Sequence, residues 1–441
     1  MPSPLLLFLG WLTPNEATVQ TNKNDERLRS FAVATTPEAD IPAYVSAASP
    51  GWIIGFELRS RWEGRSGRLR DRPDSAELTL GLTRARVFLG LSPERSFFRF
   101  SLEAQDARQF GSDFPETPLT VNELDLLQLR IRFDFDHVLH VPIAVEIGRI
   151  SFDALDRRLI ARNRFRNTTN AFEGARVRIG RTPSPIALEV LALWPTELRT
   201  ENLDTLDENR RLFGAIGSIH RPQLVLEPYY LFYDANTDRR NTFHTTGVHL
   251  FGPIGHRWDH DLHAALQIGS VGEDLHRAFA FHGELGRRFG SARAPRVSAW
   301  LNYASGDAEP DDSASGRFDP LFGASHMMYG FTDLMSWQNT INPVIAVSLT
   351  PSSRFELELI YRFNWLASAK DAFVRAGLRD PKGLSGTFIG QELDVELRWD
   401  LLPFAELNLQ YGELFAGGFV ERTGGGSGAR VFYVALTVSG P

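Results

Sequence analysis

Apolar and polar residues alternate along this chain with a period of two. Residues 127–135 read Leu-Gln-Leu-Arg-Ile-Arg-Phe-Asp-Phe, and residues 355–365 repeat the same alternation. Successive side chains of a β-strand point to opposite faces, so the pattern predicts strands with one apolar and one polar face. The alternating segments run about ten residues or more and recur over nearly the whole chain, which is typical of transmembrane β-barrels.

The connections between these segments alternate between short and long. Short turns rich in Pro and Ser occur at 92–95, 182–185 and 350–353. The long connections are 64–75, 108–122, 153–171, 197–209, 307–339, 367–387 and 416–428. Short periplasmic turns and long extracellular loops are the topology of an outer-membrane barrel. We therefore predict an all-β fold, a single transmembrane antiparallel β-barrel of about 18 strands with both chain ends on the periplasmic side.

Length and hydropathy support one large barrel. The chain has 441 residues, which is long for one ordinary soluble domain, yet no linker divides it. Transmembrane helices are excluded, because no stretch approaches the roughly 18 consecutive apolar residues that one needs. We assign 51–441 to the barrel and 1–50 to a flexible N-terminal leader. Residues 5–11 of this leader resemble the apolar part of a secretory signal.

Composition restricts the environments and partners that the protein can have. The 32 Phe, 9 Trp and 9 Tyr suit aromatic girdles at the two membrane interfaces. The net charge of −7 argues against nucleic acid as a partner. Cysteine is absent, which is compatible with passage through an oxidising periplasm. These features predict an integral protein of the Gram-negative outer membrane, in contact with lipid and lipopolysaccharide.

Two strands depart from a regular phase. In 76–91 the apolar positions change phase near Thr83, which predicts a β-bulge. In 142–152 the alternation places Arg149 in phase with Ile147, on the lipid-facing side.

The inward-facing charges sort into two arcs. The basic arc comes from the first strands and comprises Arg59, Arg61, Arg99, Arg130, Arg132, Arg176 and Arg178. The acidic arc comes from the last strands and comprises Glu356, Glu358, Glu392, Asp394, Glu396 and Glu406, interrupted by Arg362 and Arg398. Rings of Arg select anions, because the planar guanidinium grips a carboxylate with two hydrogen bonds. The alternative is that lumen charges only hydrate the wall and pair across strands.

Three loops and turns carry further candidate chemistry. The loop 153–171 holds Arg157 and Arg158, and either folds inward as a basic constriction or outward as a solvated face. Asp307, Asp311 and Asp312 could hold Ca²⁺, although their spacing does not match an EF-hand and favours a solvated acidic loop. Residues 258–263 come closest to a metal cluster but show no third ligand nearby in the sequence. No nucleophile or phosphate-binding motif appears, so we do not expect an enzyme.

Three stretches together resemble the alginate-export family of outer-membrane porins. They are residues 147–176 with Gly148-Arg149, Asp156-Arg157-Arg158-Leu159 and Phe172-Glu173-Gly174-Ala175-Arg176; residues 317–339 with Arg317-Phe318-Asp319-Pro320, His326 and Asp333; and residues 389–419 with Gly390-Gln391-Glu392 and Tyr411-Gly412. The resemblance implies an Arg-lined passage for negatively charged polyuronates such as alginate. It also implies that Arg149, Arg157, Arg158 and Arg176 line the pore or anchor its loops, which would turn Arg149 toward the lumen.

Three functions remain open at this point. The first is a passive channel for anionic oligo- or polysaccharide, carried by Arg59, Arg61, Arg130, Arg132, Arg149, Arg157, Arg158, Arg176, Arg178, Arg362 and Arg398. The second is a structural barrel that anchors or sheathes a periplasmic partner in a larger complex. The third is a soluble all-β protein.

Overall fold

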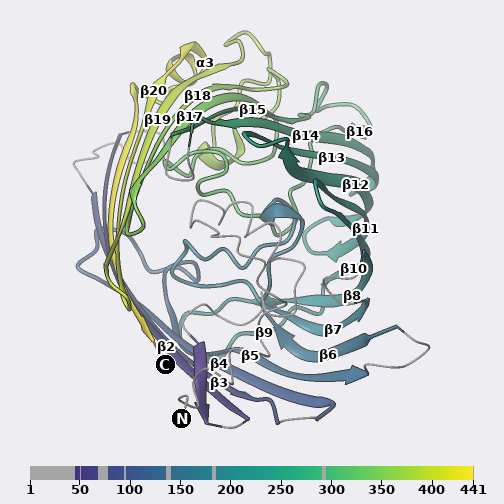
Figure 1. Ribbon diagram of the computed structural model, residues 1–441. Coiled ribbons are helices and arrows are strands. Elements are labelled where there is room, and N and C mark those ends of the chain that lie inside the picture. Colours follow the sequence, from purple (N-terminus) through teal and green to yellow (C-terminus); the bar gives the residue numbers. More distant parts are fainter. Residues whose placement is uncertain are drawn as a thin grey trace.

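The strands of this protein close into a single ring (Figure 1). The computed structural model describes residues 45–49, 51–67, 78–93, 96–135, 141–180, 185–290 and 295–440. Within these ranges, eighteen long antiparallel strands follow one another around the barrel, and β2 closes the ring by pairing with both β3 and β21. The predicted fold class is confirmed.

The barrel strands are β2 (Trp52–Gly67), β3 (Leu78–Leu91), β4 (Phe98–Phe110), β5 (Asn122–Phe135), β6 (Ile143–Ile150), β7 (Phe172–Ile179), β8 (Ile186–Glu197), β10 (Arg210–Arg221), β11 (Leu224–Asn236), β12 (Arg240–Ile254), β13 (Trp258–Val271), β14 (Asp274–Arg288), β15 (Arg296–Ala304), β17 (Thr340–Ser352), β18 (Phe355–Trp365), β19 (Phe388–Leu402), β20 (Ala405–Ala416) and β21 (Gly428–Gly440). Shorter elements are β1 (Val45–Ser49), η4 (Leu155–Arg157), β9 (Thr205–Leu206), β16 (Ala314–Ser315), η5 (Val374–Ala376) and α3 (Gly418–Arg422). Among the described residues, no helix is long and apolar enough to cross a membrane.

Short and long connections lie at opposite ends of the barrel. Residues 222–223, 353–354 and 403–404 are tight turns at one end, and residues 151–171, 305–339 and 366–387 are long loops at the other. Strand β2 begins, and β21 ends, at the short-turn end. We call this end periplasmic and the long-loop end extracellular, following the topology of outer-membrane barrels. The leader predicted for 1–50 lies outside the described residues, apart from β1, which pairs with β2.

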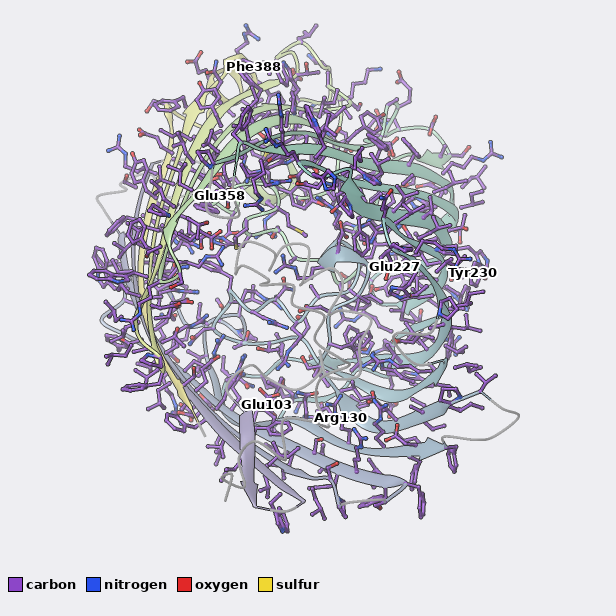
Figure 2. The ribbon with its side chains drawn as sticks, viewed as in Figure 1. Glu103, Arg130, Glu227, Tyr230, Glu358 and Phe388 are labelled. Carbon is purple, nitrogen blue, oxygen red and sulfur yellow. The ribbon has the colours of Figure 1, made fainter. Side chains whose placement is uncertain are left out.

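The two faces of the wall differ as the alternation predicts. Figure 2 shows Glu103, Arg130, Glu227 and Glu358 on the inner side of the ring, and Tyr230 and Phe388 on the outer side. Apolar side chains such as Trp52, Leu58, Val87, Ile147 and Ile345 are exposed on the outer face. An apolar exterior around a polar interior fits contact with lipid and does not fit a soluble sandwich.

The bulge predicted near Thr83 is wrong. Strand β3 pairs with β2 and with β4 in an unbroken register through this point. Leu80 and Leu82 instead face the inside of the barrel, where both are buried. The apolar residues change phase because Leu80 and Leu82 are buried inside the barrel, whereas Val87 further along the strand is exposed on the outer face. No extra residue is inserted into the ladder.

Candidate functional site

Two extracellular loops fold into the barrel and occupy its interior (Figure 1). Inner loop 1 (residues 151–171) connects β6 to β7, and inner loop 2 (residues 305–339) connects β15 to β17. The loops meet at Ile160 and Phe322, which form an isolated parallel bridge. Around it, the Phe322 N–H donates to the Leu159 carbonyl at 2.9 Å and the Ala161 N–H donates to the Phe322 carbonyl at 3.2 Å. Of the two dispositions left open for 153–171, the inward one is observed.

The inner loops share an apolar core inside the lumen. Phe152, Leu159, Phe172, Phe318 and Trp337 each expose 1% or less of their surface. Fully burying one large apolar side chain contributes about 1.5–3 kcal/mol. The loops are therefore packed against each other as a folded unit.

The basic arc of the wall holds inner loop 1. Arg59 donates hydrogen bonds to the carbonyl oxygens of Arg164 and Arg166 at 3.0 and 2.8 Å, and Arg84 donates to the same two oxygens at 3.1 and 2.9 Å. Arg61 donates to the carbonyl of Phe165. Guanidinium groups carry only donors, so they satisfy the carbonyl oxygens that an irregular loop leaves without backbone partners.

Arg84 and Arg86 extend this arc, and the sequence reasoning missed both. Arg86 donates to Gln105 and to Thr169 of inner loop 1. A bulge at Thr83 left the face of these two residues undefined in the sequence. The pairing of β3 with β2 places Arg84 opposite Arg59 and Arg86 opposite Glu57. An alignment of the two strands in this register would have identified both residues as inward-facing.

The acidic arc holds inner loop 2. Asp394 accepts from the Phe331 N–H at 3.2 Å, and Glu392 accepts from the Thr332 N–H at 3.0 Å. Arg362 sits between loop and wall, 2.7 Å from Asp394, and donates to the carbonyls of Met327 and Met328. Acceptor side chains thus meet loop amides here, and donor side chains meet loop carbonyls on the basic side. Apart from Arg362, each arc therefore matches the polarity of the backbone groups that it holds.

The remaining wall arginines pair across strands. Arg132 lies 3.2 Å from Glu146, while Arg176 and Arg178 lie 3.0 and 2.6 Å from Glu189. Arg130 lies 3.8 Å from Glu146. On the far wall, Arg398 of β19 lies 3.7 Å from Glu356 of the neighbouring strand β18. These contacts are the cross-strand pairing given above as the alternative to selectivity.

Arg149 does not turn toward the lumen. It stands opposite Leu129 and Glu173 in an unbroken register, on the same face of β6 as the exposed Ile147. The expectation that Arg149 faces the lumen is therefore corrected. The guanidinium is held at the outer face by Glu173 at 2.6 Å and by the carbonyl of Asp204 at 2.8 Å.

Arg157 and Arg158 lie at the tip of inner loop 1. The Arg157 carbonyl accepts from the N–H of Ala324 in inner loop 2 at 2.8 Å. The Arg158 guanidinium contacts Asp156 at 2.6 Å, Tyr329 at 2.9 Å and Asn302 on β15 at 3.2 Å. The Arg158 side chain thus ties inner loop 1 to the wall and to inner loop 2, whereas the contact given for Arg157 is made by its backbone carbonyl.

The carboxylates considered for Ca²⁺ lie in inner loop 2. The Asp307 N–H donates to Asp371, and Asp312 accepts from the Ala314 N–H. Burial, with the nearby Asp371 carboxylate, raises the pKa of Asp307. Among the described residues, the group that gathers ligand atoms within 4.8 Å is Asp156, His249 and Asp261. Asp261 belongs to the stretch 258–263, and Asp156, which is distant in the sequence, approaches it from inner loop 1.

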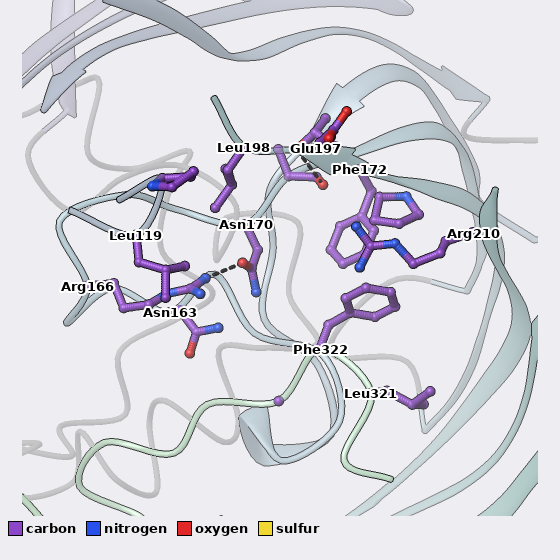
Figure 3. A pocket seen from close by; sticks show the side chains of 15 residues that line it. Leu119, Asn163, Arg166, Asn170, Phe172, Glu197, Leu198, Arg210, Leu321 and Phe322 are labelled. Atoms are coloured by element: carbon purple, nitrogen blue, oxygen red, sulfur yellow. Dashed lines mark hydrogen bonds between the residues drawn. The ribbon is translucent and has the colours of Figure 1, made fainter. Parts of the chain in front are cut away.

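A pocket opens at the extracellular mouth between inner loop 1, inner loop 2 and the ends of β7, β8 and β10 (Figure 3). Its cavity of about 330 Å³ has the size of a small-molecule site. Arg166 bonds Asn170 on one side, and Arg210, which forms an ion pair with Asp207, lines the pocket with Phe172 and Phe322 on the other. The two rings meet edge to face at 5.1 Å.

The chemistry of this mouth pocket is cationic with apolar faces. Burial lowers the pKa of Arg166 to about 10, so the group stays charged at neutral pH. Its Nε has no hydrogen-bond partner within the described structure. Asn163, Asn170 and Glu197 add donors and acceptors for hydroxyl groups.

An eighteen-stranded barrel with inward-folded loops and a charged interior defines an outer-membrane porin-type protein. Solved structures with this fold include Pseudomonas aeruginosa OccD3 (OpdP), with a TM-score of 0.60 and 12% identity over 92% of this chain and 98% of that chain. Another is Pseudomonas aeruginosa OccK11 (OpdR), with a TM-score of 0.58 and 13% identity over 90% of this chain and 99% of that chain. A third is Acinetobacter baumannii OccAB3, with a TM-score of 0.59 and 10% identity over 88% of this chain and 98% of that chain. No curated protein matches the sequence.

The family follows from the sequence itself. The model of the alginate export family matches residues 52–434, and the chain belongs to this family. The description of this family, alginate export, names a transport function.

Proposed function

We propose that this protein is a passive outer-membrane channel for anionic oligo- or polysaccharides of the polyuronate type. The observation that carries the proposal is the mouth pocket, which is lined by Arg166 and Arg210 and by the rings of Phe172 and Phe322. Guanidinium forks suit sugar carboxylates, aromatic faces suit the apolar faces of sugar rings, and amides suit hydroxyls. Membership of the alginate export family supports this substrate class.

The apolar outer face supports an integral position in the outer membrane of a Gram-negative cell, surrounded by lipid and lipopolysaccharide. The wall arginines contribute less directly to selectivity than the sequence suggested, because Arg59, Arg61 and Arg362 hold loop carbonyls. Selectivity is therefore concentrated at the mouth, where Arg166 and Arg210 border an open cavity.

Planar-bilayer recording of the full chain tests this proposal. We expect anion preference in the reversal potential under a salt gradient, and concentration-dependent block by oligouronate. Hydrogen bonds to charged groups contribute about 1.5–3 kcal/mol each, so the double variant R166Q/R210Q should weaken block by about tenfold or more.

A matched control removes two charges elsewhere on the extracellular side. Arg379 and Lys382 are exposed in the loop between β18 and β19, and R379Q/K382Q should leave block unchanged. Cation preference without block, or equal weakening by both double variants, would reject the proposal.

The filled lumen favours one alternative, a structural barrel that holds a periplasmic partner. In that case the wild-type chain would show no conductance and would purify with the partner in fixed stoichiometry.

A further inference from the structure

Ionisable side chains converge where the tip of inner loop 1 meets the barrel wall. Asp156 comes from η4, Glu227 from β11, His249 from β12, and Asp261 and His263 from β13. Each exposes 7% or less of its surface. Charged groups are rarely buried at this density unless they are paired or coordinate a metal.

Three of these residues present ligand atoms to one point. One atom each from Asp156, His249 and Asp261 lies within 4.8 Å of the others, and His249 Nε2 is 3.0 Å from Asp261 Oδ1. Zinc–ligand bonds to nitrogen and oxygen are about 2.0–2.2 Å long, so ligand atoms around one tetrahedral ion lie about 3.3–3.6 Å apart, and small side-chain shifts would bring these three atoms to that separation.

His249 is held between two carboxylates. Its Nδ1 lies 2.9 Å from Glu227 and its Nε2 lies 3.0 Å from Asp261, so both nitrogens face carboxylate oxygens. A neutral imidazole donates only one hydrogen bond, so Nε2 must hold either a second proton or a metal ion. A carboxylate on the second nitrogen is the partner that usually orients a metal-binding histidine.

Groups around Asp156 fix it in place. Arg158 donates to Asp156 Oδ2 at 2.6 Å, and His263 Nδ1 lies 3.1 Å from Asp156 Oδ1. His263 in turn contacts the Tyr229 hydroxyl at 2.8 Å. With both histidines neutral, as metal binding by His249 would require, three carboxylates and one guanidinium leave two negative charges in the cluster, which is the charge that a divalent ion neutralises.

We propose that Asp156, His249 and Asp261 bind one divalent transition-metal ion of the zinc class. Imidazole ligation selects zinc over calcium and magnesium, which prefer oxygen ligands only. The ion ties inner loop 1 to the wall between β12 and β13, and the site is independent of the solute that the channel carries.

Isothermal titration of chelator-treated, detergent-solubilised full-length protein with ZnCl₂ tests the site. We expect one equivalent of zinc per chain, no comparable uptake of Ca²⁺, and proton release that changes the measured heat between buffers of different ionisation enthalpy. H249Q and D261N should each weaken zinc binding at least tenfold. H276Q is the matched control, because His276 is a buried wall histidine on β14 bonded to Gln267 and to the Ser315 carbonyl.

The absence of stoichiometric zinc uptake by the wild-type protein, or unchanged affinity in H249Q, would overturn the proposal. If the variants fail to fold, X-ray absorption of the zinc-loaded wild type decides. A zinc coordination shell with one histidine nitrogen and otherwise oxygen ligands supports the site. A shell with several imidazoles, or with oxygen ligands alone, contradicts it.

Discussion

Single arginines in this barrel act mainly as hydrogen-bond donors to backbone. Arg59, Arg84 and Arg362 each reach two carbonyl oxygens of an inner loop. An inner loop lacks a neighbouring strand to satisfy its carbonyls, and an unpaired buried carbonyl costs about 1–3 kcal/mol. A wall residue with several donors on one rigid group replaces several backbone partners at once.

Removal of Arg362 should release inner loop 2. R362Q leaves Asp394 buried without its cation and frees the carbonyls of Met327 and Met328, a loss of about 3–5 kcal/mol for a broken buried pair. We expect a barrel that still resists SDS at room temperature but is cleaved in inner loop 2 by added protease. R379Q removes an exposed arginine and should leave the cleavage pattern of the wild type. Protection of the loop in R362Q would contradict this role.

Asp204 should make the free energy of unfolding depend on pH. Burial and the neighbouring Asp125 carboxylate raise the pKa of Asp204, in the loop between β8 and β10, to about 7. An unfolded aspartate titrates near pH 3.9, roughly. The folded protein therefore holds a proton that the unfolded chain has lost between these values, and stability falls as pH rises through this window.

We expect the apparent Tm in detergent to decline from pH 4 to pH 7.5 more steeply in the wild type than in D204N, which keeps a neutral side chain throughout. D312N, at an exposed position, should follow the wild type. Parallel profiles for the wild type and D204N would refute the assignment.

At the scale of elements, two glycines of the motifs that resemble the alginate-export family lie where β6 and β7 adjoin inner loop 1. Gly148 and Gly174 are direct partners across β6 and β7, with φ of +127° and +148°. A Cβ on Gly148 would lie 2.2 Å from the Leu129 carbonyl oxygen, and one on Gly174 would lie 2.0 Å from that of Ala192. Only glycine permits both the backbone angle and this approach.

G148A should therefore reduce the yield of folded barrel several-fold, as measured by the heat-modifiable band on gels. G440A is the matched control, since the nearest atom to its Cβ would be 3.6 Å away and its φ is ordinary. Equal yields for the two variants would show that β6 can shift to accept a side chain.

For the whole molecule, the long loops govern how much of the barrel is open. Eighteen strands enclose a wide lumen. Inner loops 1 and 2 cross this space and pack on one another through Ile160 and Phe322. The barrel wall fixes the outer dimensions of the lumen, and the inner loops determine how much of the lumen is open.

Replacement of residues 155–168 by a short Gly-Ser linker should raise single-channel conductance several-fold, because it removes half of the packed unit in the lumen. Replacement of residues 380–384, a mostly exposed turn in the loop between β18 and β19, should leave conductance unchanged. Unchanged conductance after the first replacement would mean that the passage avoids inner loop 1.

The sequence by itself determined the barrel, its strand number and the sorting of charges between the two arcs. These depend on local alternation and on turn residues, which act within a few positions of the chain. The alternating segment 355–365 coincides with β18, and the segment 127–135 lies within β5.

The tertiary structure alone decided what the charges contact. The direction of inner loop 1 depends on apolar partners such as Phe322 that lie far along the chain, and no local pattern encodes that packing. For the same reason the sequence separated Asp156 from His249 and left Arg166 and Arg210 unrelated. Loops bring such residues together through long-range contacts, whereas strands are specified residue by residue.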